Sequence, residues 1–138
     1  MDWLDLLPHQ PPMRLIEDVV SVGPGKEAVG GRVARPDDFY FQGHFPDNPV
    51  VPAIILVEMV AQIGGLAAGA PGVGDAPPPR HLRVAAIGPF KFPGAARPGA
   101  RLEASARVVG SLGGLYKVDG AVTADGIVVA SGSVTLAS

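Results

Sequence analysis

The most hydrophobic stretch of the chain runs from residue 50 to residue 70 and contains one charged side chain, Glu58. Apolar residues occupy almost every position of this stretch, which is typical of a helix enclosed on all sides. Pro52 suits the first turn of a helix, where its missing N–H needs no intrahelical partner. The pair Gly64-Gly65 and then Gly69 mark where the helix weakens or ends. We therefore predict one long buried helix that begins near Pro52.

This stretch is also about as long as a transmembrane span, which needs about 20 apolar residues. Its proline, its carboxylate and the amide of Gln62 would all be costly in lipid. We therefore expect the helix to be buried in protein, and we expect no membrane partner.

The rest of the sequence favours extended strands separated by turn residues. Residues 13–22 and 27–34 are extended runs on either side of Gly23-Pro24-Gly25, which predicts a hairpin. Four further Val- and Ala-rich runs, bounded by glycine-containing turn signals, lie at residues 81–92, 100–110, 115–123 and 127–136. A short helical turn at residues 4–7 and an exposed loop at residues 70–80 complete the prediction. Six strands and one buried helix predict an α+β fold in which an antiparallel sheet curls around the helix.

Composition narrows the possible functions. The chain has 138 residues, which predicts a single domain over residues 1–138. Only 17% of the residues are charged and the net charge is −2, which argues against nucleic acid and against a polybasic membrane patch. The lack of cysteine excludes disulfides and thiolate chemistry and fits a reducing, cytoplasmic location. The first residues carry two aspartates and no basic segment, so they do not resemble a signal peptide.

Two titratable residues stand out around the start of the predicted helix. His44 lies in a loop rich in Gly and Pro, and Glu58 follows fourteen positions later. A carboxylate in an apolar wall is costly when ionised, so it is normally either paired or tuned for proton transfer. Considered alone, Glu58 fits a salt-bridged core residue better than a catalytic acid.

The other candidates carry weaker signals. His9 lies in a Pro-rich loop without an acidic neighbour in sequence, so we predict that it hydrogen-bonds nearby backbone. The aromatic residues 39–41 either line an apolar pocket or pack in the core beneath the loop. The three histidines are far apart in sequence and no glycine-rich phosphate loop follows a strand, so no metal and no cofactor is predicted.

A longer motif around His44 and Glu58 resembles that of a known family, the β-hydroxyacyl-acyl-carrier-protein dehydratases of fatty-acid synthesis. The motif reads Gln42-Gly43-His44-Phe45-Pro46, then Asn48-Pro49, then Pro52, then Glu58 with Ala61-Gln62. Similar flanking segments are Leu7-Pro8-His9, Ile16-Glu17-Asp18-Val19, Phe90-Lys91-Phe92 and Arg97-Pro98-Gly99. The resemblance therefore covers nearly the whole chain.

The resemblance implies a hot-dog fold, which is a curved antiparallel sheet around one long helix. It also implies a homodimer, with a trimer of dimers as a further option, and active sites at the interface between two chains. In that family a histidine of one chain faces an acidic residue on the partner's helix, and the matching positions are His44 and Glu58. The related dehydratase-isomerases carry Asp where this chain has Glu58, so the resemblance favours dehydration without isomerisation.

The implied reaction dehydrates a 3-hydroxyacyl thioester to a trans-2-enoyl thioester. It needs a base for the C2 proton, a role that suits His44, and an acid for the C3 hydroxyl, a role that suits Glu58. The backbone amides of Ala53 and Ile54, at the helix start, are natural donors to the thioester oxygen as it gains negative charge.

Further substrate-binding candidates are Gly43 and Phe45, which flank the histidine, and Gln62, one helical turn beyond Glu58. Gln62 is expected to orient the Glu58 carboxyl group by a hydrogen bond. The family usually has Gly where this chain has Ala53, and a basic-aromatic pattern where it has Gln10-Pro11-Pro12. These departures suggest a divergent branch that serves polyketide or other specialised acyl chains.

The implied substrate is carried by an acyl-carrier protein, which is acidic and would favour a basic rim on this chain. Candidates for such a rim, or else ordinary solvated strand ends, are Arg80, Arg83, Lys91, Arg97 and Arg101. Two other functions stay open. A hot-dog thioesterase would use Glu58 to activate water, and a non-catalytic acyl-binding subunit is conceivable because of Ala53.

Overall fold

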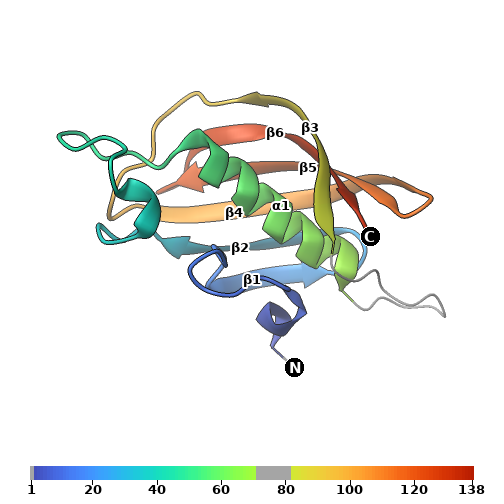
Figure 1. Ribbon diagram of the computed structural model, residues 1–138. Helices are drawn as coiled ribbons and strands as arrows, with labels where there is room; N and C mark the ends of the chain where they lie inside the picture. The colour runs from blue at the N-terminus through green and yellow to red at the C-terminus, as the bar shows by residue number, and fades with distance from the viewer. Residues whose placement is uncertain (1, 71–81) are drawn as a thin grey trace.

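A computed structural model describes residues 2–70 and 82–138, in which one helix lies across one face of a curved six-stranded antiparallel sheet (Figure 1). The elements in chain order are η1 (Trp3–Leu6), β1 (Asp18–Gly23), β2 (Glu27–Val33), η2 (Phe39–Phe41), α1 (Ala53–Gly69), β3 (Arg83–Lys91), β4 (Arg101–Leu112), β5 (Leu115–Ala124) and β6 (Ile127–Ala137). The strand order is β1-β2-β4-β5-β6-β3. This is the predicted α+β hot-dog arrangement.

The turns form where the sequence predicts them. Asp125 and Gly126 both adopt positive φ angles, 48° and 86°, as a two-residue hairpin turn between β5 and β6 requires. The glycines at 113 and 114, between β4 and β5, have φ angles of 57° and 81°. Glycine and aspartate tolerate this backbone region, so the turn residues fix the register of the last three strands.

The first predicted strand begins too early, because residues 13–17 are not part of β1. Leu15 and Ile16 are fully buried, but they lie in a loop that precedes the strand. The Leu15 N–H donates to Oε1 of Gln62, and Nε2 of Gln62 donates to the Met13 carbonyl. A helix side chain therefore satisfies backbone groups that a neighbouring strand would otherwise bind.

The helix α1 begins at Ala53, with Pro52 as its N-cap residue, and ends at Gly69. Gly64 does not interrupt it, because this residue lies against the sheet, where an added Cβ would come 2.9 Å from Val118 Cγ1. On the facing strand, a Cβ at Gly120 would come 2.5 Å from Val60 Cγ1. The two glycines therefore allow helix and sheet to approach closely. Of the predicted loop at residues 70–80, only Ala70 lies within the described residues.

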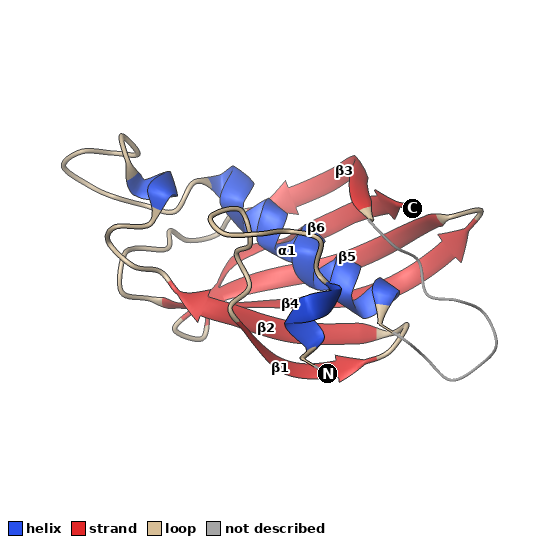
Figure 2. Cartoon of the chain, turned by 60° about the horizontal axis from the view of Figure 1, so that its bottom comes forward, coloured by secondary structure: helices blue, strands red, loops and turns tan. Residues whose placement is uncertain are grey.

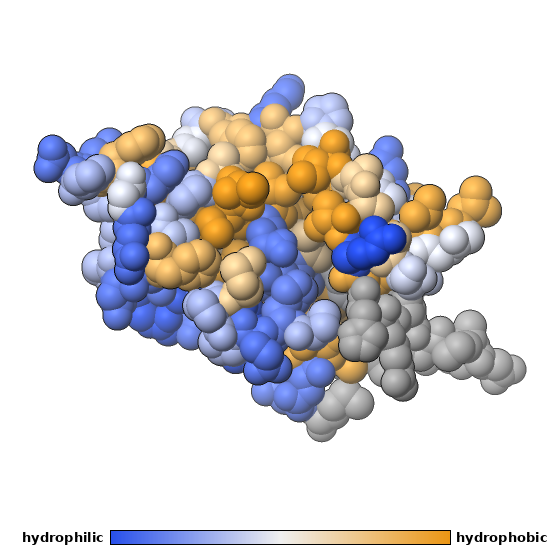
Figure 3. Space-filling view, in the orientation of Figure 1, coloured by the Kyte–Doolittle hydropathy of each residue, from blue (hydrophilic) through white to orange (hydrophobic). Residues whose placement is uncertain are grey.

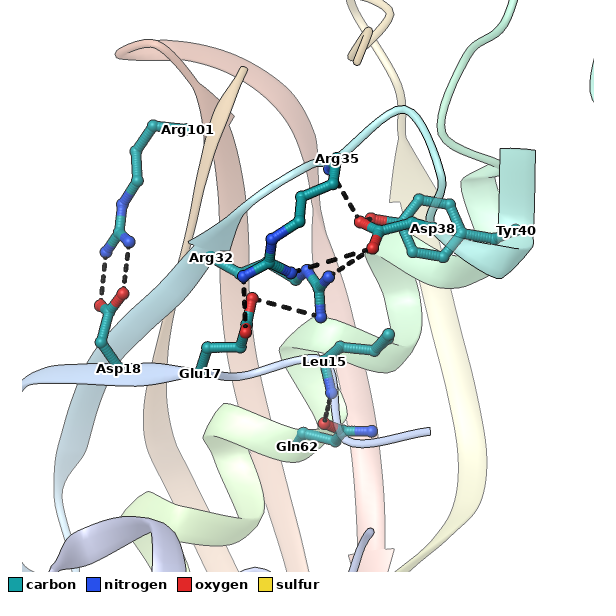
Figure 4. A network of polar contacts seen from close by, with 9 residues as sticks. All are labelled: Leu15, Glu17, Asp18, Arg32, Arg35, Asp38, Tyr40, Gln62 and Arg101. Atoms are coloured by element: carbon teal, nitrogen blue, oxygen red, sulfur yellow. Dashed lines mark hydrogen bonds and ion pairs between the residues drawn. The ribbon is translucent and has the colours of Figure 1, made fainter. Parts of the chain in front are cut away.

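A network of ion pairs ties the segment before the His44 loop to the sheet (Figure 4). The Arg32 side chain is 9% exposed, and its guanidinium lies 2.6 Å from Asp38 Oδ1 and 3.5 Å from Glu17 Oε1. Tyr40 donates its hydroxyl to Asp38 Oδ2 at 2.7 Å, and burial raises the pKa of Tyr40 well above its ordinary value. Tyr40 and Phe41 are buried in the core, whereas Phe39 is 40% exposed. Core packing is therefore the role of two of the three aromatic residues.

No helix within residues 2–70 and 82–138 has both the length and the apolar character that a membrane crossing requires. The most hydrophobic stretch instead packs against the sheet, with Met59, Val60 and Ile63 fully buried.

Candidate active site

The loop between η2 and α1 fixes the imidazole of His44. Nδ1 of His44 lies 3.2 Å from the carbonyl oxygen of Val50. The backbone of the same residue donates to the Phe41 carbonyl at 3.1 Å and accepts from the Val50 N–H at 3.0 Å. The ring also stacks on Phe45, with 4.4 Å between ring centroids. When Nδ1 carries the proton and donates to Val50, Nε2 is the ring nitrogen that holds a free lone pair, which is the form of a general base.

The helix start follows this loop directly. The Val51 N–H donates to the Ala96 carbonyl at 2.8 Å, which anchors the chain just before α1. Pro52 contributes no N–H, and its carbonyl accepts from Ile55 at 2.9 Å. The side chains of Ala53 and Ile54 are exposed, the latter by 72%. The first amides of a helix have no intrahelical acceptor, so this end of α1 carries a partial positive charge next to the loop that holds the histidine.

Glu58 lies in the second turn of α1, beside His9 of the N-terminal loop. The Nε2 atom of His9 is 4.0 Å from Glu58 Oε1, and both side chains are about three quarters buried. His9 was predicted to hydrogen-bond nearby backbone, and that prediction is wrong. Its Nδ1 is buried without a hydrogen-bond partner among the described residues, and its Nε2 faces the carboxylate.

The environment of Glu58 favours its neutral form. Burial raises the pKa of the Glu58 carboxyl group above its ordinary value, while the charge of His9 and the amide of Gln62 act in the opposite direction. A carboxyl group with a raised pKa keeps its proton to higher pH, which is the property of a general acid.

Gln62 is 1% exposed, and both ends of its amide bind the loop that precedes β1. Figure 4 shows the contact with Leu15. Its Oε1 accepts from the Leu15 N–H at 2.9 Å, and its Nε2 donates to the Met13 carbonyl at 2.7 Å. Sequence reasoning predicted a hydrogen bond that orients Glu58. A hydrogen bond from the Gln62 amide does act on Glu58, where it lowers the pKa of the carboxyl group, and the bonds to Leu15 and Met13 in addition hold the N-terminal loop against the helix.

The predicted site residues fall into two groups within one chain. Gly43, His44 and Phe45 share the loop, and Ala53 and Ile54 follow at the helix start. A second group, Glu58 and Gln62, faces the N-terminal loop together with His9. Neither a hydrogen bond nor an ion pair joins the two groups within residues 2–70 and 82–138.

The surface next to both groups is apolar. Figure 3 shows hydrophobic side chains gathered over the region where α1 and β3 lie in Figure 1. Phe45 is 53% exposed and Ile87, in β3, is 58% exposed. Within the part of the chain that the structure describes, β3 is an edge strand with β6 as its one neighbour, and most of its residues are exposed. An open strand edge with exposed apolar side chains is typical of an interface.

The basic residues of the predicted rim are dispersed. Arg83 and Lys91 lie at opposite ends of β3, and Arg97 donates to Asn48 in the loop that holds His44. Arg101 makes a two-pronged ion pair with Asp18, at 2.6 and 2.7 Å, and this contact lowers the pKa of Asp18. Arg80 lies outside the described residues. Arg97 is therefore the basic residue of this set that contacts the candidate site. Among the described residues, no three side chains of His, Asp or Glu gather as metal ligands.

The model of the family described as FabA-like domain matches residues 7–133 of the chain. The chain belongs to the FabA-like family. Among its curated relatives is the 3-hydroxyacyl-[acyl-carrier-protein] dehydratase FabZ of Thermoanaerobacter pseudethanolicus, 41% identical over 66 residues, or 48% of this chain and 46% of that protein. The protein of the same description from Desulfotalea psychrophila is 46% identical over 61 residues, or 44% and 41%. The matched stretch of this FabA-like chain therefore spans under half the length of these relatives.

Solved structures place the FabA-like chain in the hot-dog fold. It matches a chain of the dehydratase heterocomplex ApeI:P from Xenorhabdus doucetiae with a TM-score of 0.78 and 18% identity, covering 99% of this chain and 90% of that chain. It also matches the E. coli PaaI protein of the phenylacetic acid degradation operon, with a TM-score of 0.65, 16% identity and coverage of 88% and 82%. At such low identity these matches establish the fold alone, and one fold serves several functions.

Proposed function

We propose that this FabA-like chain dehydrates 3-hydroxyacyl thioesters, carried on an acyl-carrier protein, to trans-2-enoyl thioesters and water. The observation that carries the proposal is the fixed imidazole of His44, whose Nδ1 faces the Val50 carbonyl. Because its Nε2 is then the free nitrogen, the ring is oriented as a base next to the amides of a helix start. The curated FabZ relatives support the choice of substrate class.

The proposed reaction divides the proton transfers between two side chains. His44 Nε2 removes a proton from C2, and the electron pair of that C–H bond moves toward the thioester carbonyl. The amides of Ala53 and Ile54 stabilise the negative charge on the thioester oxygen. Glu58, whose raised pKa favours the protonated form, gives its proton to the C3 hydroxyl as the C3–O bond breaks and the C2–C3 double bond forms. Water is the leaving group.

We propose that two copies of the chain complete each site. Phe45, Ile54 and the open edge of β3 supply an exposed apolar surface on the side of α1. If two such surfaces meet, His44 of one copy faces Glu58 of the other, which accounts for their separation within one chain. A homodimer is thus the smallest active unit, and a trimer of dimers is the larger assembly that we propose.

The proposed partner is an acidic acyl-carrier protein in the cytoplasm. Gly43 and Phe45 border the histidine and would contact the acyl chain near the thioester. Arg97, which donates to Asn48 in the same loop, is the proposed contact for the carrier. Specialised or polyketide chains remain the proposed substrates, because Ala53 carries a methyl group where the thioester must approach the backbone.

The experiment compares His44→Asn and Glu58→Gln with Asp47→Asn, a matched change of an exposed loop carboxylate. On a 3-hydroxyacyl thioester, each site variant should lose a factor of about 100 to 10,000 in kcat, the range for general acid and base groups. Asp47→Asn should stay within about twofold of the wild type, the small effect expected of a surface change.

Product analysis separates this function from its alternatives. Enoyl absorbance without release of free thiol supports a dehydratase, and thiol release without the enoyl product would instead identify a thioesterase. Binding of the acyl carrier with no turnover of any acyl chain would identify a non-catalytic subunit. Full activity of both site variants would contradict the assignment of His44 and Glu58.

A further inference from the structure

The N-terminal segment is fastened to α1 on the face that carries Glu58. Figure 2 shows this segment passing over the helix, and the buried amide of Gln62 binds it at Leu15 and Met13. Glu58 and Gln62 are separated by four positions of one helix, so their side chains lie on the same face one turn apart. The clamp at Gln62 therefore determines which part of the segment lies over Glu58.

The part that lies over Glu58 is His9. Its Nε2 is 4.0 Å from Glu58 Oε1, and 26% and 25% of the two side chains are exposed. Its Nδ1 is buried and has no hydrogen-bond partner among the described residues. A histidine that only supports the loop would bind the backbone through a ring nitrogen, whereas the polar neighbour of this ring is the carboxylate.

A small cavity lies beside the pair. Its volume is about 20 Å³, and its lining includes His9, Pro8, Ala61 and Gln62. This is room for about one water molecule. A water molecule in this space could hydrogen-bond the imidazole while the ring keeps its place next to Glu58.

We propose that His9 is a positioning residue for Glu58, holding the carboxyl group through Nε2 and coupling the ionisation of the two side chains. The effect of His9 on catalysis rests on the proposed dehydratase function. The coupling itself is a property of the chain that can be measured without turnover.

The charges around Glu58 make the direction of the coupling clear. A protonated imidazole stabilises the ionised carboxylate, and histidine is the side chain that changes charge between about pH 5 and 8. Within the described residues, the groups that act on Glu58 are His9 and the uncharged amide of Gln62. In the proposed dimer, His44 of a second copy would be the other titratable neighbour.

The first experiment measures titration by NMR. The chain has four glutamates, so a sample labelled with ¹³C at the glutamate carboxyl groups gives few signals, and Glu58→Gln identifies the one of interest. In His9→Gln, the Glu58 midpoint should rise by about half a pH unit or more, the size expected of a partly exposed ion pair. Gln10→Ala, a change of the exposed neighbouring residue, should leave the Glu58 midpoint unchanged.

The reciprocal measurement does not depend on the folding of the His9 variant. Because a coupling between two sites is mutual, the ¹⁵N shifts of the His9 imidazole in the wild type should show an inflection at the pH where Glu58 titrates, and this inflection should be absent in Glu58→Gln. The absence of that inflection in the wild type, or an unchanged Glu58 midpoint in folded His9→Gln, would overturn the proposal.

The activity measurement separates this inference from the proposed function. In an active dehydratase, His9→Gln should lower kcat about tenfold or more, change KM by less than about twofold, and move the basic limb of the pH profile to higher pH. A loss of kcat with an unchanged profile would mean a structural role and would overturn the proposal. If the wild type has no dehydratase activity, the proposed function fails and the two NMR titrations still decide the coupling.

Discussion

The amide of Gln62 offers the most direct test of how the N-terminal loop is held. Gln62→Met keeps the length and approximate volume of the side chain and removes both hydrogen bonds. The Leu15 N–H is fully buried, so the loss of its acceptor costs about 1–3 kcal/mol. The Met13 carbonyl belongs to a residue that is 46% exposed, so water can replace the lost donor and the cost is about 0.5–1.5 kcal/mol.

The expected net effect follows from these two losses and one gain. The greater hydrophobicity of Met returns about 1 kcal/mol at this buried position. The free energy of unfolding should therefore fall by about 2 kcal/mol, which corresponds to a decrease in Tm of about 8 °C for a chain of this size. The Leu15 amide should also exchange its hydrogen faster than in the wild type.

The assay is thermal and urea unfolding at one fixed protein concentration, because association would shift both measurements. Gln10→Met is the matched control, since it makes the same change on an exposed side chain of the same segment and should alter stability by less than about 0.5 kcal/mol. A Gln62→Met variant as stable as its control, with an equally protected Leu15 amide, would refute the reasoning.

Two further predictions concern stability. Because the folded-state pKa of Glu58 is raised, its ionisation destabilises the fold as pH rises through that pKa, so Glu58→Gln should unfold at a higher temperature than the wild type at pH 7 to 8. This gain should vanish at about pH 3, more than one unit below the ordinary pKa of Glu, because the carboxyl group is then protonated in both the folded and the unfolded state. A gain independent of pH would contradict the linkage. Gly120→Ala should cost about 1–3 kcal/mol, because its Cβ would come 2.5 Å from Val60 Cγ1 and 2.7 Å from the Ser105 carbonyl oxygen. Gly110→Ala, with open space around its Cβ, should be near neutral in the same unfolding assay, and equal effects of the two changes would count against close helix–sheet packing.

Local sequence patterns predict much of the architecture. The hydrophobic stretch predicts α1, because only enclosure by other elements can bury apolar residues on every side of a helix. Turn pairs such as Asp125-Gly126 predict the hairpins, because few residues tolerate positive φ angles. The motif that contains His44 and Glu58 indicated the family, and the match over residues 7–133 confirms it.

The contacts of the site depend on residues that are far apart in sequence. The run at residues 13–22 has the composition of a strand, but Gln62 binds the backbone at Leu15 from a helix 47 positions away, and β1 begins only at Asp18. Arg101 was a candidate contact for a carrier protein, but its guanidinium is paired with Asp18, 83 positions earlier in the sequence.

His9 shows the same limit of sequence reasoning most clearly. A histidine between prolines carries no local sign of an acidic partner, and the prediction of a backbone contact was wrong. The sequence by itself predicted the helix, the turns and six strands, although β1 begins five residues later than the predicted run, because these elements follow from apolar runs and turn residues. His44 and Glu58 became candidate catalytic residues through the resemblance of their motif to a known family. The tertiary structure alone decided which side chains meet, because the sheet brings the N-terminal loop over one face of α1 and thereby sets His9 beside Glu58.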